Sequence, residues 1–346
     1  MKAAIYKGQH DVEIRELPLP ELKDNDVLIQ NLYSSICGTD VAVYRYGAAT
    51  GHRIFENGEF GHETVSRIVA KGENVTDFEI GERVYPYPLF ATGDTRRAGT
   101  IGGFSEYILV PDAKRNHSLY SVDERISDRA ACLIEPFTVG CRAAKRGQPA
   151  PGETAVIFGC GTIGIAAAIA MRYFGMEKVM LCDLSAFRLS IAKKLGFAVC
   201  CLSSDDFDST AGQYFGEAHS LNGPVPDIDC FLDAAGSEQI LDRFMQSGKI
   251  GSRLVNVAVN KNHRDLDMLH LTYSSKSIIG SGGYLPEDVG DVMDIMKSGR
   301  WDIESLITHE FPLDRIGEAL ETASDSDHAL NVVIRMPGYS SSGTPA

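Results

Sequence analysis

Short apolar runs that alternate with helical patterns dominate the middle of the chain. Helical patterns at 162–174 and 185–195 each end at a glycine, Gly175 and Gly196, and a glycine suits the left-handed turn that closes a helix. Since strands joined by helical crossovers run parallel, the pattern predicts a doubly wound parallel sheet. Six apolar runs are its expected strands: 154–158, 178–182, 198–202, 228–232, 253–258 and 277–280.

The ends of the chain show a different pattern. Short β-type runs at 27–33, 64–70 and 105–110 are separated by Gly, Pro and Asp, which is typical of an irregular antiparallel β domain. After residue 284 we expect two helices and a strand, too few elements for a separate core, which therefore rejoin the first domain. These last elements are expected at 287–298, 314–323 and 331–335, and the tail after Pro337 is expected to be disordered.

The prediction is therefore an α/β protein of two domains. The first comprises residues 1–140 and 284–346, and the second, dinucleotide-binding domain comprises 141–283. A chain of 346 residues with 44% apolar content is large enough to fill two cores.

Charge and cysteine content narrow the class of protein. The chain has 33 Lys and Arg against 47 Asp and Glu, a net charge of −14, and no dense basic cluster, so nucleic acid and anionic membranes are disfavoured partners. No segment has the pattern of a signal peptide or a membrane span. The eight cysteines are scattered without a paired framework, which favours reduced thiols in the cytoplasm.

A glycine-rich turn follows the first strand of the predicted parallel sheet. In Gly159-Cys-Gly-Thr-Ile-Gly164, the first glycine permits the tight turn, Gly161 lets a pyrophosphate approach the backbone, and the third glycine lets the helix pack closely on the strand. The helix N-terminus at Thr162 and Ile163 supplies amides for the phosphate charge. The turn therefore predicts a dinucleotide site.

The second strand of this sheet ends in Asp183, 19 residues after Gly164. A carboxylate there accepts hydrogen bonds from ribose hydroxyls and repels a 2′-phosphate, which favours NAD over NADP. The simpler interpretation is that Asp183 only caps the next helix. Arg188, one turn into that helix, could lie against the adenine or be a solvated surface residue.

Four side chains upstream of the glycine-rich turn are candidate metal ligands: Cys37, His62, Glu63 and Glu135. Thiolate, imidazole and carboxylate are the donors that zinc prefers, and three protein ligands with an open position define a catalytic site. Glu135 lies in an otherwise apolar segment, where a buried charge needs a partner. Taken singly, these residues could equally be a core cysteine, a surface His-Glu pair and a helix cap.

In combination, these motifs resemble a known family. The order Cys37-Gly-Thr-Asp, Gly61-His-Glu, Ile134-Glu-Pro and then the glycine-rich turn is similar to that of zinc-dependent medium-chain alcohol dehydrogenases. The likeness is greatest to the branch that holds sorbitol and other polyol dehydrogenases, threonine dehydrogenase and butanediol dehydrogenase. It includes Gly102-Gly-Phe-Ser-Glu-Tyr107 and extends from Met1 to about Arg335.

The resemblance implies a GroES-like β catalytic domain and a Rossmann NAD-binding domain, with zinc in the cleft between them. Cys37 and His62 would be zinc ligands, while Glu63 would be a ligand or would exchange with water. Glu135 matches a carboxylate that binds the metal or stands just behind it. Thr39 matches the hydroxyl that passes the substrate proton toward solvent.

The chain departs from the family pattern at three places. The lobe of four cysteines that holds a structural zinc is missing, because no cysteine lies between Cys37 and Cys132, so we expect one catalytic zinc only. Ala42 stands where many relatives have a relay histidine, for which His52 could substitute. The run 281–284 replaces an arginine that grips polyol hydroxyls, so a smaller secondary alcohol, diol or hydroxy acid is as well supported as a sugar alcohol.

The sequence thus predicts an NAD- and zinc-dependent dehydrogenase that interconverts a secondary alcohol or polyol hydroxyl with its ketone. By analogy we expect a homodimer or homotetramer paired through the Rossmann sheet. One alternative is a zinc-free quinone or enone reductase of the same superfamily, for which zinc content would be near zero. The other is a non-enzymatic NAD-binding paralogue, which would bind NADH tightly without turnover.

Overall fold

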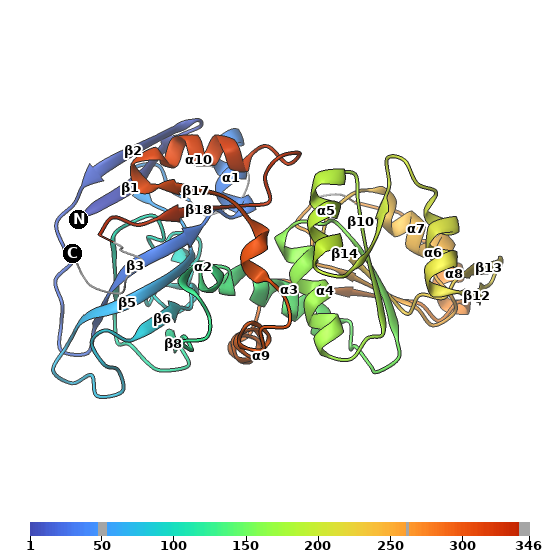
Figure 1. Ribbon diagram of the computed structural model, residues 1–346, viewed down its shortest axis with the longest axis horizontal. Coiled ribbons are helices and arrows are strands. Elements are labelled where there is room, and N and C mark those ends of the chain that lie inside the picture. The colour runs from blue at the N-terminus through green and yellow to red at the C-terminus, as the bar shows by residue number, and fades with distance from the viewer. Residues whose placement is uncertain (48–53, 261–262, 339–346) are drawn as a thin grey trace. The chain divides into compact units, whose positions relative to one another are not determined.

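The computed structural model describes residues 1–47, 54–260 and 263–338, so His52 and the tail beyond 338 lie outside the described residues. The chain forms two compact units, one made of Met1–Glu135 with the chain from Ile303 onward, the other of Pro136–Asp302. Figure 1 shows that the chain leaves the first unit, builds the second, and returns to the first with its last elements. None of the described helices is both long enough and apolar enough to span a membrane.

A mostly antiparallel sheet organises the first unit. Its strand order is β17-β18-β3-β5-β6-β8, and β7 also pairs with β3. Only the pairing of β17 with β18 is parallel. The central strand β3 is buried on both faces, at eight of its nine residues. The strands are β3 Val27–Ser35, β5 Glu63–Lys71, β6 Arg83–Pro86, β7 Tyr107–Val110, β8 Leu119–Ser121, β17 Ile307–Pro312 and β18 Asn331–Arg335.

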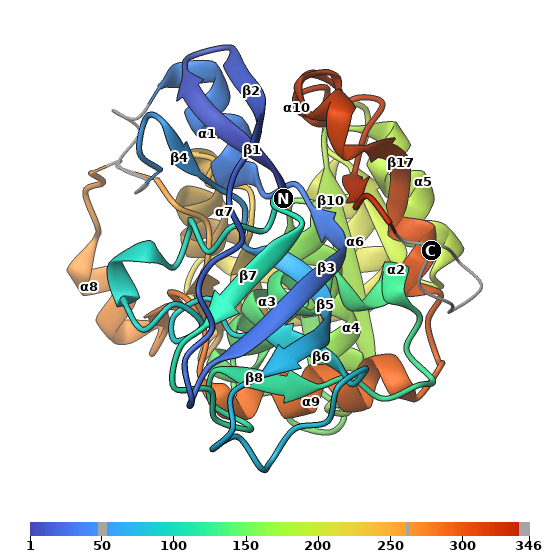
Figure 2. The same cartoon turned by 90° about the vertical axis from the view of Figure 1, so that its left-hand side faces the viewer.

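A smaller sheet and a few helices complete this unit. Figure 2 shows β3 and β7 side by side, with the β1 and β2 pair at the upper edge of the unit. Helices α1 and α10 contribute Val43, Ile316 and Leu320 to one apolar core with β1 and β18. The elements are β1 Lys2–Gly8, β2 Asp11–Glu16, β4 Gly58–Glu59, α1 Gly38–Tyr46, α2 Asp128–Ala131 and α10 Ile316–Ala323, with short 3-10 turns at Thr95–Arg97, Ile303–Leu306 and Leu313–Arg315.

The second unit contains the predicted parallel sheet. All neighbouring strands are parallel, and the order β11-β10-β9-β14-β15-β16 reverses direction beside the first strand, β9. The predicted strands are confirmed within two or three residues at their ends, and Gly175 and Gly196 have the expected positive φ, at 99° and 87°. The strands are β9 Thr154–Phe158, β10 Lys178–Asp183, β11 Ala198–Cys201, β14 Cys230–Asp233, β15 Arg253–Asn256 and β16 Ser277–Gly280.

Helices cover the sheet of the second unit, as expected for a doubly wound fold. Six run in this unit, and α3 enters it from the first: α3 Ile134–Arg146, α4 Thr162–Tyr173, α5 Ala186–Lys194, α6 Phe207–Phe215, α7 Gln239–Ser247, α8 Met268–Tyr273 and α9 Pro286–Lys297. The small hairpin formed by β12 Glu217–Ser220 and β13 Gly223–Pro226 is not predicted from the sequence pattern. Two prolines in β13 remove backbone donors, which makes this hairpin hard to recognise from pattern alone.

The division of the chain differs from the predicted one at its second boundary. We expected residues from 284 onward to rejoin the first domain, but the return occurs at Ile303, so α9 lies in the second unit. Helix α9 is held there by charge, because Lys145 on α3 pairs with the fully buried Asp288 at 2.7 Å and with Asp291 at 2.6 Å. Its apolar face, which includes Val289 and Val292, is buried as well.

Candidate active site

Cys37 lies where β3 ends and α1 begins. Its sulfur accepts a hydrogen bond from the Thr39 amide at 3.5 Å, and its own amide donates to the Asp40 carboxylate at 3.0 Å, so the two residues form a reciprocal cap on α1. The preceding residue is fixed by β18, since the Ile36 amide donates to the Val332 carbonyl at 3.0 Å. The thiol therefore has a defined position at a strand-to-helix junction.

His62 and Glu63 come from the adjacent strand, at the start of β5. The register of β3 with β5 places Glu63 opposite Ser35, two residues before Cys37. Gly61 has φ of 85°, and a Cβ there would lie 2.6 Å from the Phe104 ring, so only glycine fits before the histidine. As a result, one ligand atom each from Cys37, His62 and Glu63 lies within 4.8 Å of the others.

The electrostatics of this cluster suit a bound cation. Burial, with the nearby carboxylates, raises the pKa of the Cys37 thiol well above its usual value, and burial also raises the pKa of Glu63. Burial lowers the pKa of His62, but Asp40, Glu135 and Glu63 outweigh it and the net shift is upward. Acidic groups crowded in a buried site disfavour one another's charge, and a divalent cation relieves that conflict.

The available donor atoms match zinc in particular. The Nδ1 atom of His62 is buried and has no hydrogen-bond partner among the described residues, and the side chain is 8% exposed. A buried nitrogen without a partner is costly unless a ligand occupies it. Sulfur, imidazole nitrogen and carboxylate oxygen together form a donor set of the zinc type.

Glu135 and Thr39 lie near this cluster without joining the group of ligand atoms. Glu135 is 8% exposed at the start of α3, and its charge contributes to the raised pKa values of Cys37 and His62. Its oxygens do not fall within the 4.8 Å group, so a position behind the ligands agrees better with the structure than direct ligation. Thr39 lies in the first turn of α1 and is partly exposed.

Asp40 is a site residue that our reading of the sequence did not assign. It is 1% exposed, it accepts the Cys37 amide, and burial raises the pKa of its carboxyl to about 7, which the charge of His62 opposes. Groups that hydrogen-bond to a metal-binding residue help to orient it. The signal was present in the sequence, because an acidic residue three positions after a helix cap is the pattern of a capping box.

The glycine-rich turn of the second unit has no room for side chains at two of its three glycines. Gly159 has φ of 100°, and a Cβ there would lie 2.9 Å from the backbone at Ala234 and Ala235. A Cβ on Gly164 would lie 1.9 Å from the Gly159 carbonyl oxygen. Gly161 is the N-cap of α4 and has no side chain that could cap the first amides of this helix, and a helix N-terminus is the place where proteins bind phosphate.

Asp183 and Arg188 border this turn. One Asp183 oxygen accepts the Cys160 amide at 2.6 Å and the other accepts the Ser185 amide at 2.8 Å. The cap of helix α5 is Ser185, so the alternative role of Asp183 as that helix's N-cap does not apply. The Arg188 guanidinium is partly buried and lies 3.9 Å from where a Cβ on Gly161 would stand.

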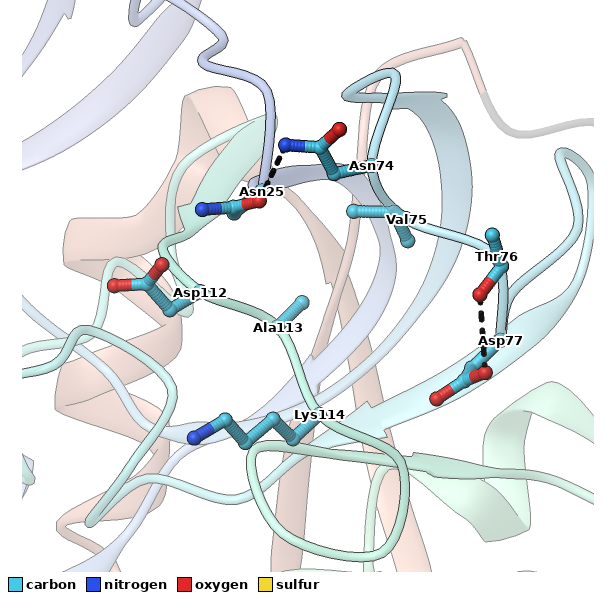
Figure 3. Close-up of a pocket in the computed structure, with 8 residues that line it drawn as sticks. All are labelled: Asn25, Asn74, Val75, Thr76, Asp77, Asp112, Ala113 and Lys114. Carbon is cyan, nitrogen blue, oxygen red and sulfur yellow. Dashed lines mark hydrogen bonds between the residues drawn. The ribbon is translucent and has the colours of Figure 1, made fainter.

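A pocket of about 270 Å³ lies elsewhere in the first unit, and Figure 3 shows its polar lining. Asn25 and Asn74 are joined by a hydrogen bond of 3.0 Å, and the Lys114 amine extends along the opposite side. Asn25 precedes β3 and Asn74 follows β5, whereas Cys37 follows β3 and His62 precedes β5. The pocket is therefore at the other end of these strands from the ligand cluster.

Comparison with known proteins assigns both units of the chain to known domain families. Residues 23–120 match the alcohol dehydrogenase GroES-like domain, and residues 162–298 match the zinc-binding dehydrogenase family. The L-galactonate-5-dehydrogenase of Escherichia coli (strain K12) is 30% identical over 89% of this chain and 90% of its own length. The sorbitol dehydrogenase of Bacillus subtilis (strain 168) is 27% identical over 93% of both chains.

Among solved structures, 2R,3R-butanediol dehydrogenase from Bacillus subtilis superposes with a TM-score of 0.82 over 96% of this chain and 99% of that one, at 24% identity. At this identity the likeness establishes the fold, which combines a GroES-like β unit with a Rossmann unit. The alignments with the two sequence relatives cover almost the full length of this chain and of each relative. The chain therefore belongs to the zinc-dependent medium-chain alcohol dehydrogenases, in the branch that includes polyol dehydrogenases.

Proposed function

We propose that this protein oxidises a secondary alcohol or polyol hydroxyl to the ketone, or catalyses the reverse reduction, with NAD and a single zinc ion. The observation that carries the proposal is the convergence of Cys37, His62 and Glu63 in a buried cluster. A zinc-free reductase has no need of this cluster. The membership of the chain in a family of alcohol and polyol dehydrogenases supports the same conclusion.

In this proposal Cys37 and His62 hold the zinc, and Glu63 is the third protein ligand. When bound, zinc acts as a Lewis acid that lowers the pKa of a substrate hydroxyl, and NAD accepts the hydride. Glu135 stays behind the ligands, where its negative charge favours a bound cation. Asp40 fixes the orientation of Cys37 through its amide and acts electrostatically on His62.

The substrate proton leaves through the Thr39 hydroxyl in this proposal. Thr39 donates its amide to the Cys37 sulfur and is partly exposed, so the residue lies beside a proposed ligand and within reach of solvent. A hydroxyl can accept one proton while it donates another, which is the requirement for a relay. Ala42 has no group that could continue the relay, so the second step of proton release is left to water.

The cofactor is held by the second unit. Gly159, Gly161 and Gly164 let the pyrophosphate approach the backbone, and the amides of Thr162 and Ile163 at the start of α4 stabilise its charge. Asp183 accepts hydrogen bonds from the ribose hydroxyls and repels a 2′-phosphate. Arg188 lies next to the adenosine half of the cofactor. NAD is accordingly preferred over NADP.

An activity screen with metal control tests the proposal. NAD reduction is measured with polyols, diols, hydroxy acids and amino alcohols, before and after removal of zinc by a chelator. We expect activity on at least one class, its loss on chelation, its recovery with zinc, and a zinc content of one per chain. Full activity after complete zinc removal would contradict the proposal, and two zinc ions per chain would contradict the single site.

We also propose that the protein is a homodimer or homotetramer that assembles through β16. This strand ends the six-stranded sheet, its outer edge pairs with no described strand, and Ser277, Ile278 and Gly280 are exposed. Unpaired edges with exposed apolar side chains favour association with another strand. Light scattering should give a multiple of the 37.6 kDa chain mass, and Ile278→Lys should shift the mass toward the monomer.

We place the enzyme in the cytoplasm. The support is that all eight cysteines are free thiols in the structure, as a reducing compartment requires. Fractionation of the source cells with an antibody against the protein would test this, and recovery with extracellular proteins would contradict it.

A further inference from the structure

Asp233 is a buried carboxylate that the proposed reaction leaves unexplained. It is the last residue of β14, so it lies at the carboxyl end of the sheet next to β9, where the glycine-rich turn begins. The side chain is 6% exposed, and no Lys, Arg or His among the described residues forms an ion pair with it. A buried carboxylate without a cation is unfavourable unless other groups satisfy it.

Backbone amides of two loops provide those partners. The Oδ1 atom of Asp233 accepts the amides of Ala235 at 2.9 Å and Gly236 at 2.7 Å, in the loop after β14. Its backbone carbonyl accepts the amides of Val257 at 3.0 Å and Ala258 at 3.1 Å, in the loop after β15. One residue therefore fixes two loops at the carboxyl edge of the sheet.

These two loops pack closely against each other, and the loop after β14 also packs closely against the glycine-rich turn. The contact that excludes a side chain at Gly159 is with the peptide between Ala234 and Ala235. A Cβ on Gly236 would lie 3.3 Å from the Ala258 side chain. A shift of the loop after β14 would therefore disturb the loop after β15.

The second carboxylate oxygen of Asp233 has a different environment. Oδ2 accepts no hydrogen bond from the part of the chain that the structure describes, and the residue lines a cavity of about 210 Å³ together with Asn256, Leu254 and Ile278. This cavity leaves room for an amide in place of the carboxylate. Asn can consequently replace Asp here while it keeps the Oδ1 acceptor.

We propose that Asp233 is a positioning residue for the cofactor, which holds the loops after β14 and β15 in the shape that the nicotinamide half of NAD requires. The inference rests on the proposed NAD site. A dinucleotide crosses the carboxyl ends of such a sheet at the point where strand order reverses, here between β9 and β14. Asp183 on β10 belongs to the adenosine half, which leaves the β14 and β15 side for the second nucleotide.

Binding of NADH and of AMP separates this role from a purely structural one. AMP occupies only the adenosine half, whereas NADH also needs the loops that Asp233 holds. We expect Asp233→Ala to raise the Kd of NADH about tenfold or more, since small misplacements of binding groups cost up to about 100-fold, while the Kd of AMP changes less than about threefold. Asp233→Asn should bind NADH within about threefold of the unchanged protein, because the Oδ1 acceptor remains.

Asp229→Asn is the matched control, because Asp229 directly precedes the strand that Asp233 ends. Asp229 accepts the Thr154 amide at 3.0 Å and pairs with Lys249, so its loss should lower the Tm without changing either Kd. If Asp233→Ala does not fold, Asp233→Ser takes its place, because a shorter acceptor should still weaken NADH binding selectively.

The proposal is overturned if the alanine or serine variant binds NADH as tightly as the unchanged protein, or loses affinity for NADH and AMP equally. It is also overturned if Asp233→Asn binds NADH as weakly as the alanine variant. Failure of the unchanged protein to bind NADH would contradict the proposed cofactor instead.

Discussion

The candidate metal cluster and the glycine-rich turn are built in opposite ways. At the cluster, His62 and Glu63 are buried and Cys37 is half-buried, and the pKa values of all three are displaced by burial and by nearby charges. At the turn, backbone atoms carry the function, and Gly159 and Gly164 matter because a side chain would not fit. One site is therefore sensitive to the identity of side chains, and the other to their size.

Replacement of Cys37 should give the largest effect and should leave the turn untouched. We expect Cys37→Ala to lower kcat/KM by more than about 100-fold, because even residues behind a metal's ligands cost about 10–100-fold. NADH affinity should remain within about threefold, since the turn belongs to the other unit. Steady-state kinetics, zinc analysis and NADH titration measure the three quantities, with the partly exposed Cys201→Ala as control. Full turnover in Cys37→Ala would refute the zinc mechanism.

A methyl group on Gly164 should have the opposite effect: it should impair the turn and leave the metal cluster unchanged. A Cβ 1.9 Å from the Gly159 oxygen forces the turn apart, so Gly164→Ala should weaken NADH binding on the order of 100-fold and destabilise the second unit by about 3 kcal/mol. Its zinc content should be unchanged. Gly212→Ala on α6, where a Cβ meets nothing within 4 Å, is the matched control. Normal NADH affinity in Gly164→Ala would show that the turn is not the phosphate site.

Asp40 tests whether the cluster depends on residues behind the ligands. Asp40→Asn keeps an acceptor for the Cys37 amide but removes the charge near His62, so zinc affinity should fall about 10–100-fold. Competition with a chromogenic chelator gives the affinity. The exposed helix residue Arg45→Gln on α1 serves as control. Unchanged zinc affinity in Asp40→Asn would show that the charge of Asp40 does not contribute to zinc binding.

Lys276 tests whether a displaced pKa in the second unit affects stability alone. Its pKa is displaced, yet the residue has no proposed role in catalysis. Burial lowers its pKa to about 8, and its amine donates to the Met245 and Phe244 carbonyls at the end of α7. Between pH 8 and 10.5 the unfolded chain binds more protons at this residue, so it should make the free energy of unfolding rise with pH in that window.

In Lys276→Met the increase in the free energy of unfolding between pH 8 and 10.5 should be smaller by about 1 kcal/mol, a value reduced for partial solvent screening. The kcat/KM at pH 7 should stay the same. Denaturant unfolding at several pH values measures the difference, with the exposed Lys194→Met as control. A large loss of activity would mean that displaced pKa values mark function in the second unit too.

The sequence predicted the elements whose signals are local. Strands of the parallel sheet and the turn at Gly159 were evident because periodicity and glycine spacing depend on neighbouring residues. The boundary at 284 was wrongly expected because α9 is held by Lys145, about 140 residues earlier in the chain, and no local pattern records such a pair.

For the candidate site, residue types indicated Cys37, His62 and Glu63, and the structure brings their ligand atoms together. Glu135 was less certain from the sequence because burial alone does not distinguish a ligand from a neighbouring charge. The contribution of Asp233 depends on hydrogen bonds between two loops, so its role could be inferred only from coordinates.

The pairing of β18 with β3 has a consequence for the order in which the protein is made. Val333 and Ile334 pair with Ser35 and Ser34, immediately before Cys37, yet about 300 residues separate these strands in the chain. During synthesis the entire second unit leaves the ribosome before β18 exists, and domains generally fold as units as they emerge. The second unit can thus finish folding while the proposed zinc site still lacks the strand that fixes its thiol. A chain that is shortened near its end should therefore still bind NAD but should no longer bind zinc.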